Sequence, residues 1–167
     1  MLELPSNCKA FTTSGKSILN QLKNTAIVRC GGKEIKVDAL WDTGATMTNI
    51  SQEVVKALGL VPTGRQRMLT PSGSYDAPTY LIDVELPNQV IIKDLRVCSS
   101  EIGSQRIGLL IGMDIISTGD FAVSNYNGKT VFTFRSPSAQ VTDYYKQIVA
   151  ANAMGPRHGT SRGKKKR

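Results

Sequence analysis

The chain has 167 residues, a formal net charge of +8, and one histidine, His158, near its C-terminal end. Catalytic triads, Cys–His dyads and His-based zinc sites all need an ordered imidazole, so we do not expect any of them here. The length is that of one domain with short extensions.

Residues 1–23 are polar and irregular, and we expect a flexible N-terminal arm. The arm has no apolar core that would make it a signal peptide, and no window of the chain is long and apolar enough for a transmembrane helix, so no membrane partner is expected. Segment 10–17 resembles a phosphate-binding loop, but Ala10 replaces its first glycine and no apolar strand precedes it. Nucleotide binding is therefore not expected. Three widely spaced cysteines (Cys8, Cys30 and Cys98) indicate reduced thiols and a cytoplasmic protein rather than a disulfide framework or a zinc site.

The alternating pattern of a β-hairpin begins at residue 26. Runs 26–30 and 33–40 are separated by Gly31-Gly32, which supplies the positive φ of a tight turn. The second run leads into Asp42-Thr43-Gly44-Ala45. Ser51 is a good N-cap for a helix over 52–58, and Gly59 is placed to end it.

Further strands follow. Runs 68–70 and 79–86 flank the turn-rich segment 71–78 and predict a long hairpin with a mobile tip. Strands are also predicted at 90–92 and 95–97. A short buried strand over 107–112 precedes a brief helix that Asp114 can cap. Runs 121–124 and 130–134 enclose Asn127-Gly128, a strong hairpin signal.

Residues 138–153 change to helical spacing, with an apolar stripe made of Val141, Tyr144, Tyr145, Ile148 and Val149. Such a stripe usually packs on the body of the domain; alternatively, Val141, Tyr144 and Ile148 extend a dimer contact. Residues 157–167 hold six of the 21 basic residues and no acid, which leaves 15 basic against 13 acidic residues elsewhere. This tail is predicted to be disordered: either it only solubilises the chain, or it weakly contacts nucleic acid or acidic surfaces.

Asp42-Thr43-Gly44 alone is a weak signal, because Asp and Thr close many turns with side-chain hydrogen bonds. Its context is more specific: it ends an alternating strand, and a hairpin with a Gly-containing tip separates it from the apolar strand that ends at Gly112. This combination, over about residues 25–135, resembles the retropepsin-like aspartic proteases. Gly112-Met113-Asp114 departs from the retroviral Gly-Arg-Asn or Gly-Arg-Asp and resembles the cellular and bacterial branch.

The resemblance implies a mainly β, closed, single-domain fold in which the apolar-Gly strand passes the Asp-Thr-Gly loop, with a short helix after that strand. The added C-terminal helix would lie outside the minimal fold. We therefore expect a protease domain over 24–136, an amphipathic helix over 137–155 and a basic tail over 156–167.

Peptide hydrolysis by carboxylates needs two of them, because one takes a proton from water while its protonated partner polarises the carbonyl. Two carboxyls about 3 Å apart share one proton, since both cannot ionise. The sequence holds one Asp-Thr-Gly, so a working site needs two chains that each contribute Asp42. The prediction is a homodimeric aspartic endopeptidase that acts on a peptide or protein substrate, with no metal and no cofactor.

The resemblance also implies roles for the residues around Asp42. Thr43 would bond across the dimer, Gly44 would let the backbone approach the carboxylates, Ala45 would keep the substrate wall small, and Gly112 would pack against this loop. Flap contacts to substrate are assigned to Thr70, Ser72, Gly73 and Ser74; the alternative for that segment is an ordinary exposed hairpin.

Two other functions remain open. One is a dimeric retropepsin-like module that binds peptides without cleaving them, although an intact Asp42 argues against it. The other is a nucleic-acid-binding protein driven by the basic tail, which would lose its function if residues 157–167 were deleted.

Overall fold

The computed structural model describes residues 6–70, 73–102 and 106–154, and strands form most of its regular structure. The mainly β fold class is therefore confirmed. In chain order the elements are β1 (Lys9–Ser14), β2 (Lys23–Cys30), β3 (Lys33–Trp41), β4 (Asn49–Ser51), α1 (Gln52–Leu58), β5 (Gly64–Thr70), β6 (Gly73–Glu85), β7 (Ile91–Ser100), β8 (Leu109–Ile111), α2 (Met113–Ile116), β9 (Asp120–Ser124), the 3₁₀ turn η2 (Tyr126–Gly128), β10 (Val131–Ser136) and α3 (Tyr144–Ala153).

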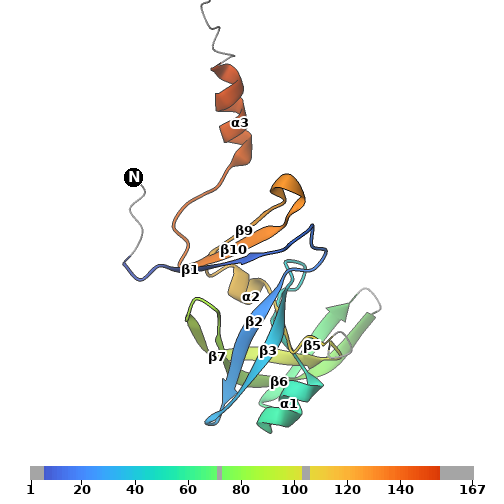
Figure 1. Cartoon of the computed structure of the whole chain (residues 1–167). Coiled ribbons are helices and arrows are strands. Elements are labelled where there is room, and N and C mark those ends of the chain that lie inside the picture. Colours follow the sequence, from blue (N-terminus) through green and yellow to red (C-terminus); the bar gives the residue numbers. More distant parts are fainter. Residues whose placement is uncertain (1–5, 71–72, 103–105, 155–167) are drawn as a thin grey trace, which may run out of the picture.

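The larger sheet closes on itself. Its strand order is β2-β3-β8-β4-β7-β6-β5, and an additional pairing of β2 with β6 turns the sheet into a barrel from which β5 projects (Figure 1). Alternate side chains of the barrel strands point inward and form the core, among them Val28, Ala39, Ile50, Val97 and Leu109, all fully buried. The expectation of a closed β fold is thus confirmed.

A second sheet of three strands, in the order β1-β10-β9, lies at the end of the barrel where β3 stops (Figure 1). The prediction that residues 1–23 are irregular is wrong for β1. Its short polar sequence gives little local signal, and the strand forms because it pairs with β10, with Phe11 opposite Phe134. That pairing joins segments more than a hundred residues apart, so local patterns do not reveal it.

The predicted β2–β3 hairpin and helix α1 are both confirmed. Gly31 and Gly32 have φ values of 56° and 78°, as a two-residue turn of this kind requires. The Ser51 hydroxyl accepts a hydrogen bond from the Val54 amide, and Gly59 ends α1 in the left-handed conformation.

The predicted long hairpin is present, but its strands are longer than expected. β5 begins at Gly64 and β6 at Gly73, so most of the turn-rich segment 71–78 is strand. Pro78 lies opposite Arg65 of β5, but the Thr79 carbonyl accepts from Thr63 on the β5 side, so the backbone of Pro78 faces β7 instead. Pairing with β7 begins only at Thr79, opposite Cys98, so the missing N–H of Pro78 interrupts no ladder bond. The two short strands predicted at 90–92 and 95–97 are one strand, β7, with a bulge opposite Asp83.

The hairpin around Asn127-Gly128 is also present, with both residues at positive φ inside η2. The brief helix after β8 forms as α2. However, the prediction that Asp114 caps α2 is wrong, because Gly112 occupies the N-cap position and Asp114 lies within the first turn.

Helix α3 begins at Tyr144, later than the predicted start, after Asp143 as its N-cap. Its apolar stripe does not pack on the body: Val141 is 93 % exposed and Tyr145 79 % exposed, and α3 extends away from both sheets (Figure 1). The prediction of packing on the domain is therefore wrong, while the alternative that the stripe extends a dimer contact stays a prediction. No helix among the described residues is long and apolar enough to span a membrane. His158 and the basic residues 157–167 lie outside the described residues.

Candidate active site

The loop that begins at Asp42 continues directly from β3. The Asp42 amide donates to the Ile111 carbonyl at 2.9 Å, which extends the parallel pairing of β3 and β8 by one residue. The Gly44 amide donates to Asp42 Oδ1 at 2.8 Å, and the Ala45 amide donates to the Asp42 carbonyl at 3.2 Å. Asp42 and Ala45 are half-buried, whereas Thr43 and Gly44 are exposed. The Asp42 carboxylate therefore stands on a short turn with a fixed backbone and is open to solvent on one side.

Gly112 packs directly against the backbone of this loop. A Cβ atom at Gly112 would lie 2.6 Å from the Met47 carbonyl carbon and 3.0 Å from the Ala45 carbonyl oxygen. The Met113 amide donates to that Ala45 oxygen at 2.8 Å. The structure thus brings Gly112 against the Asp42 loop, in the arrangement that the resemblance implied.

A network that the sequence did not reveal holds the far end of the loop. Thr48, fully buried, donates its hydroxyl to Asp114 Oδ1 at 2.6 Å and its amide to Asp114 Oδ2 at 2.8 Å. The same hydroxyl accepts from the Gly112 amide at 3.1 Å. Because both oxygens of Asp114 are engaged here, this carboxylate has a structural role. No local sequence signal pairs Thr48 with Asp114.

An aromatic cluster anchors the other end of the loop. Trp41, the residue before Asp42, is nearly buried and stacks on Phe121 with ring centroids 5.1 Å apart. It also contacts Phe11, Phe132 and Phe134. These four phenylalanines belong to the three-stranded sheet, so this sheet is docked on the barrel through the residue that precedes Asp42.

The predicted flap residues lie at the far end of the β5–β6 hairpin. Thr70 ends β5 and Gly73 begins β6, where they pair with each other. Ser72 lies outside the described residues. The Ser74 hydroxyl accepts from the Arg67 guanidinium within the same hairpin, so in the single chain it contacts this hairpin rather than the Asp42 loop.

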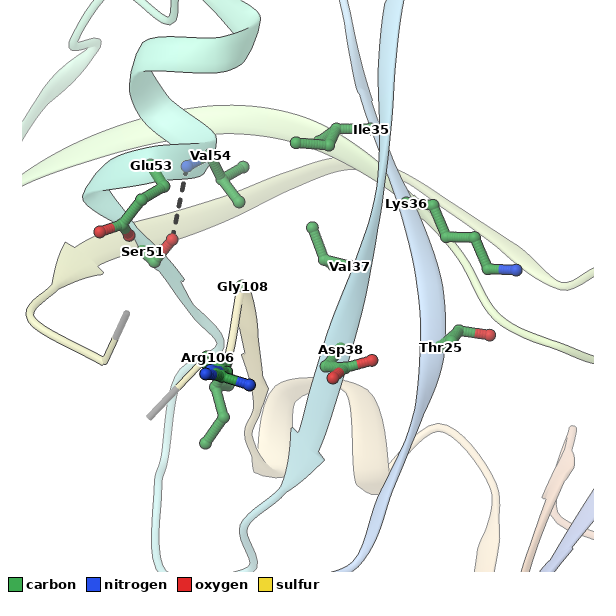
Figure 2. A pocket seen from close by; sticks show the side chains of 11 residues that line it. Thr25, Ile35, Lys36, Val37, Asp38, Ser51, Glu53, Val54, Arg106 and Gly108 are labelled. Atoms are coloured by element: carbon green, nitrogen blue, oxygen red, sulfur yellow. Dashed lines mark hydrogen bonds between the residues drawn. The ribbon is translucent and has the colours of Figure 1, made fainter. Parts of the chain in front are cut away.

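Within the described ranges, no three His, Cys, Asp or Glu side chains are grouped as metal ligands would be. A cavity of about 510 Å³ lies beside β3 and α1, and none of its lining residues belongs to the segment 42–45 (Figure 2). The loop and this cavity are therefore two separate features of the chain.

Comparison with known proteins identifies the family. A family model described as gag-polyprotein putative aspartyl protease matches residues 27–118, which include both Asp42-Thr43-Gly44 and Gly112. The chain belongs to this family. The match covers more than half of the chain, and its limits lie within β2 and directly after α2.

The chain is also similar to several solved structures. A retropepsin-like aspartic protease from Rickettsia conorii is 17 % identical, with a TM-score of 0.51 over 78 % of this chain and 96 % of that one. The Simian Foamy Virus (mac) protease is 18 % identical over 56 % of this chain and 89 % of that one, with a TM-score of 0.42. The EIAV protease complexed with the inhibitor HBY-793 is 14 % identical over 58 % of this chain and 86 % of that one, with a TM-score of 0.45. The comparison with curated proteins found no match. The chain thus belongs to an aspartyl protease family, and the similarity to the Rickettsia structure shows that it has the retropepsin-like fold.

Proposed function

We propose that this retropepsin-like protein is an aspartic endopeptidase in which two copies of the chain each contribute Asp42 to one active site. The observation that carries the proposal is the Asp42 loop itself: its carboxylate is presented on a turn that β8, Gly112 and Trp41 hold in place. Such preorganisation is what a catalytic group requires.

The need for a second copy follows from the chemistry of the pair. The chain has one Asp-Thr-Gly, and the carboxylate of Asp114 is engaged by Thr48. A second Asp42 supplies the missing group across a two-fold axis. One ionised carboxylate then removes a proton from water, and its protonated partner donates a hydrogen bond to the scissile carbonyl oxygen.

The neighbouring residues have supporting roles in this proposal. The Gly44 amide already donates to Asp42 Oδ1, so it orients the carboxylate and stabilises its charge. A side chain at Gly44 would meet that oxygen at 3.2 Å, and the absence of one keeps the carboxylate accessible. In this proposal Thr43, which is exposed, contacts the second copy. Ala45 would line the substrate side, and the segment Thr70–Ser74 would close over substrate as a flap.

The decisive experiment is Asp42→Asn. We expect a folded dimer that cleaves no peptide, because an amide cannot take the proton from water. Asp94→Asn is the matched control: Asp94 is an exposed residue of β7 with φ of 51°, a conformation that Asn accepts. A peptide-library digestion analysed by mass spectrometry compares the variants with the wild type, and undiminished cleavage by Asp42→Asn would reject the mechanism.

Dimer dependence is tested separately. Cleavage per chain should fall steeply when dilution produces monomers, as sedimentation at the same concentrations would show. Full activity from a demonstrated monomer would exclude the shared site. Binding of peptides without cleavage by the wild-type dimer would favour the non-catalytic module instead. The cytoplasmic location and the domain limits at 24–136 stay predictions.

A further inference from the structure

One edge of β3 is only partly occupied. β2 pairs with β3 along its whole length, from Lys33 to Leu40. On the other side, β8 pairs with β3 only from Ala39 to Trp41. The position of a neighbouring strand beside residues 33–37 is therefore vacant in the described chain, although β3 continues there in regular extended conformation. At Asp38 the carbonyl still accepts a hydrogen bond from the Gly108 amide.

The backbone of Lys36 faces this vacant position. The Trp41 amide donates to the Leu22 carbonyl, so the odd-numbered residues of β3 direct their backbone groups to β2. The Asp38 carbonyl accepts from the Gly108 amide on the opposite side, so the even-numbered residues face away from β2. Lys36 is the even-numbered residue before Asp38, so its N–H and C=O also face away from β2, and no described strand pairs with them. An unpaired pair of this kind can accept an added strand.

The cavity of about 510 Å³ lies at this edge, because residues from both faces of β3 line it. Ile35 and Val37 belong to one face of the strand, and Lys36 and Asp38 to the other. Figure 2 shows Val37 and Lys36 leaving β3 on opposite sides. Because Arg106, Ile107 and Gly108 also line it, the cavity reaches the unpaired edge of β3, and from there it extends over the outer face as far as Thr25 of β2.

The two sides of the cavity differ in chemistry. On the inner side the lining is apolar: Val54 of α1 and Ile107 are both 1 % exposed, and Val37 is nearly buried. On the outer side, Lys36, Asp38 and Arg106 are exposed, and none of the three has an ion-pair partner among the described residues. A ligand in this position would meet apolar groups on one side and charges of both signs on the other.

We propose that this cavity binds an extended peptide that adds to β3 as a strand. The peptide backbone would bond to the N–H and C=O of Lys36 and to the N–H of Asp38. Its side chains would alternate, with apolar ones towards Val37 and Val54 and polar ones towards the charged rim. This mode of recognition takes its affinity from main-chain hydrogen bonds and its specificity from alternate side chains. The site lies outside the segment 42–45, so it goes beyond the proposed catalytic function and does not depend on it.

Random octapeptides displayed on phage are selected on the full-length Asp42→Asn chain, which removes the proposed cleavage. Enriched peptides are synthesised and titrated into the ¹⁵N-labelled chain. We expect alternating apolar and polar sequences, with amide shifts concentrated at 35–38, 51–54 and 106–108. Lys36→Pro deletes the N–H that faces the cavity but no bond to β2, so binding should weaken by about 2- to 10-fold, as expected for one lost backbone hydrogen bond. Lys36→Ala keeps that N–H and should weaken binding less.

A second measurement uses the unaltered β3 sequence, in case Lys36→Pro perturbs folding. When the peptide amides are N-methylated one at a time, binding should be abolished only for every second amide, because only alternate amides of a paired strand face β3. The proposal is overturned if no peptide is enriched, if the shifts lie at 42–45, or if N-methylation has no alternating effect. It is also overturned if Lys36→Pro changes the sedimentation of the chain alone, because a second copy would then occupy the edge. None of these readouts requires catalysis, so failure of the peptide-binding proposal can be distinguished from failure of the proposed catalytic function.

Discussion

Gly112→Ala is expected to displace the Asp42 loop. The added Cβ would lie 2.6 Å from the Met47 carbonyl carbon and 2.7 Å from its oxygen, whereas ordinary contact begins at 3.4 Å. The two backbones must therefore separate by about 0.8 Å, the difference between 3.4 and 2.6 Å. The close atoms are main-chain atoms, so no flexible side chain can absorb the shift. Hydrogen bonds also tie the two segments together on either side of Met47, because the Gly112 amide donates to the Thr48 hydroxyl and the Met113 amide donates to the Ala45 carbonyl.

Overpacking of this kind costs about 1–3 kcal/mol of unfolding free energy. At a typical urea dependence, the denaturation midpoint should fall by about 0.5–1.5 M at fixed protein concentration. A misplacement near 1 Å also costs about 100-fold in catalysis, so we expect kcat/KM to fall about 10- to 100-fold. Met113→Ala is the matched control, since it alters the adjacent, more exposed residue without adding an atom near Met47. An unchanged midpoint and unchanged cleavage by Gly112→Ala would refute the packing argument.

Three other predictions concern the network, the small sheet and α3. Asp114→Ala leaves the buried Thr48 amide and hydroxyl without their acceptor and should lower the unfolding free energy by about 2–4 kcal/mol, measured by chemical denaturation; an effect below about 1 kcal/mol would contradict the network. Hydrogen bonds from the Ser138 hydroxyl and the Ala139 amide, followed by Arg135, lower the pKa of Asp120 to about 2. Because this pKa is lowered in the folded chain, the charged form of Asp120 stabilises the fold at pH values above the ordinary Asp pKa, and this stabilisation is lost as the pH falls from about 4 to about 2. Asp120→Asn should therefore lower the unfolding free energy by about 1–2 kcal/mol at neutral pH and by progressively less in acid. A difference between the variant and the wild type that grows in acid would show the sign to be wrong. Tyr145→Ser on α3 should change the unfolding free energy by less than about 0.5 kcal/mol because the side chain is exposed, whereas a larger loss would reveal a packed helix.

Local chemistry allowed several elements to be predicted from the sequence. Gly31-Gly32, the Ser51 cap and the alternation of residues 33–40 each act over a few residues, and the structure contains the hairpin and helix that they predict. Asp42-Thr43-Gly44 likewise directly follows its strand in the sequence, although it became a specific signal only together with the apolar strand that ends at Gly112. The hairpin and the helix required no knowledge of distant partners.

The features that could not be predicted depend on partners far away in the chain. β1 forms through β10, and Thr48 bonds to Asp114 across the loop. The α3 stripe has helical spacing, but spacing alone does not reveal whether a surface exists for it to cover. The vacant edge beside Lys36 arises because β8 is too short to cover β3, and strand ends are set by packing rather than by pattern.

The docking of the small sheet through Trp41 has a practical consequence. Trp41 is the single tryptophan of the chain, lies nearly parallel to the Phe121 ring and precedes Asp42. Its fluorescence will therefore report one location, the junction between the two sheets beside the Asp42 loop. If the three-stranded sheet separates from the barrel before the barrel unfolds, the emission will shift to longer wavelength while the far-ultraviolet circular dichroism still shows an intact barrel. The wild-type chain thus carries an intrinsic optical label at the position where loosening of the small sheet would release Asp42.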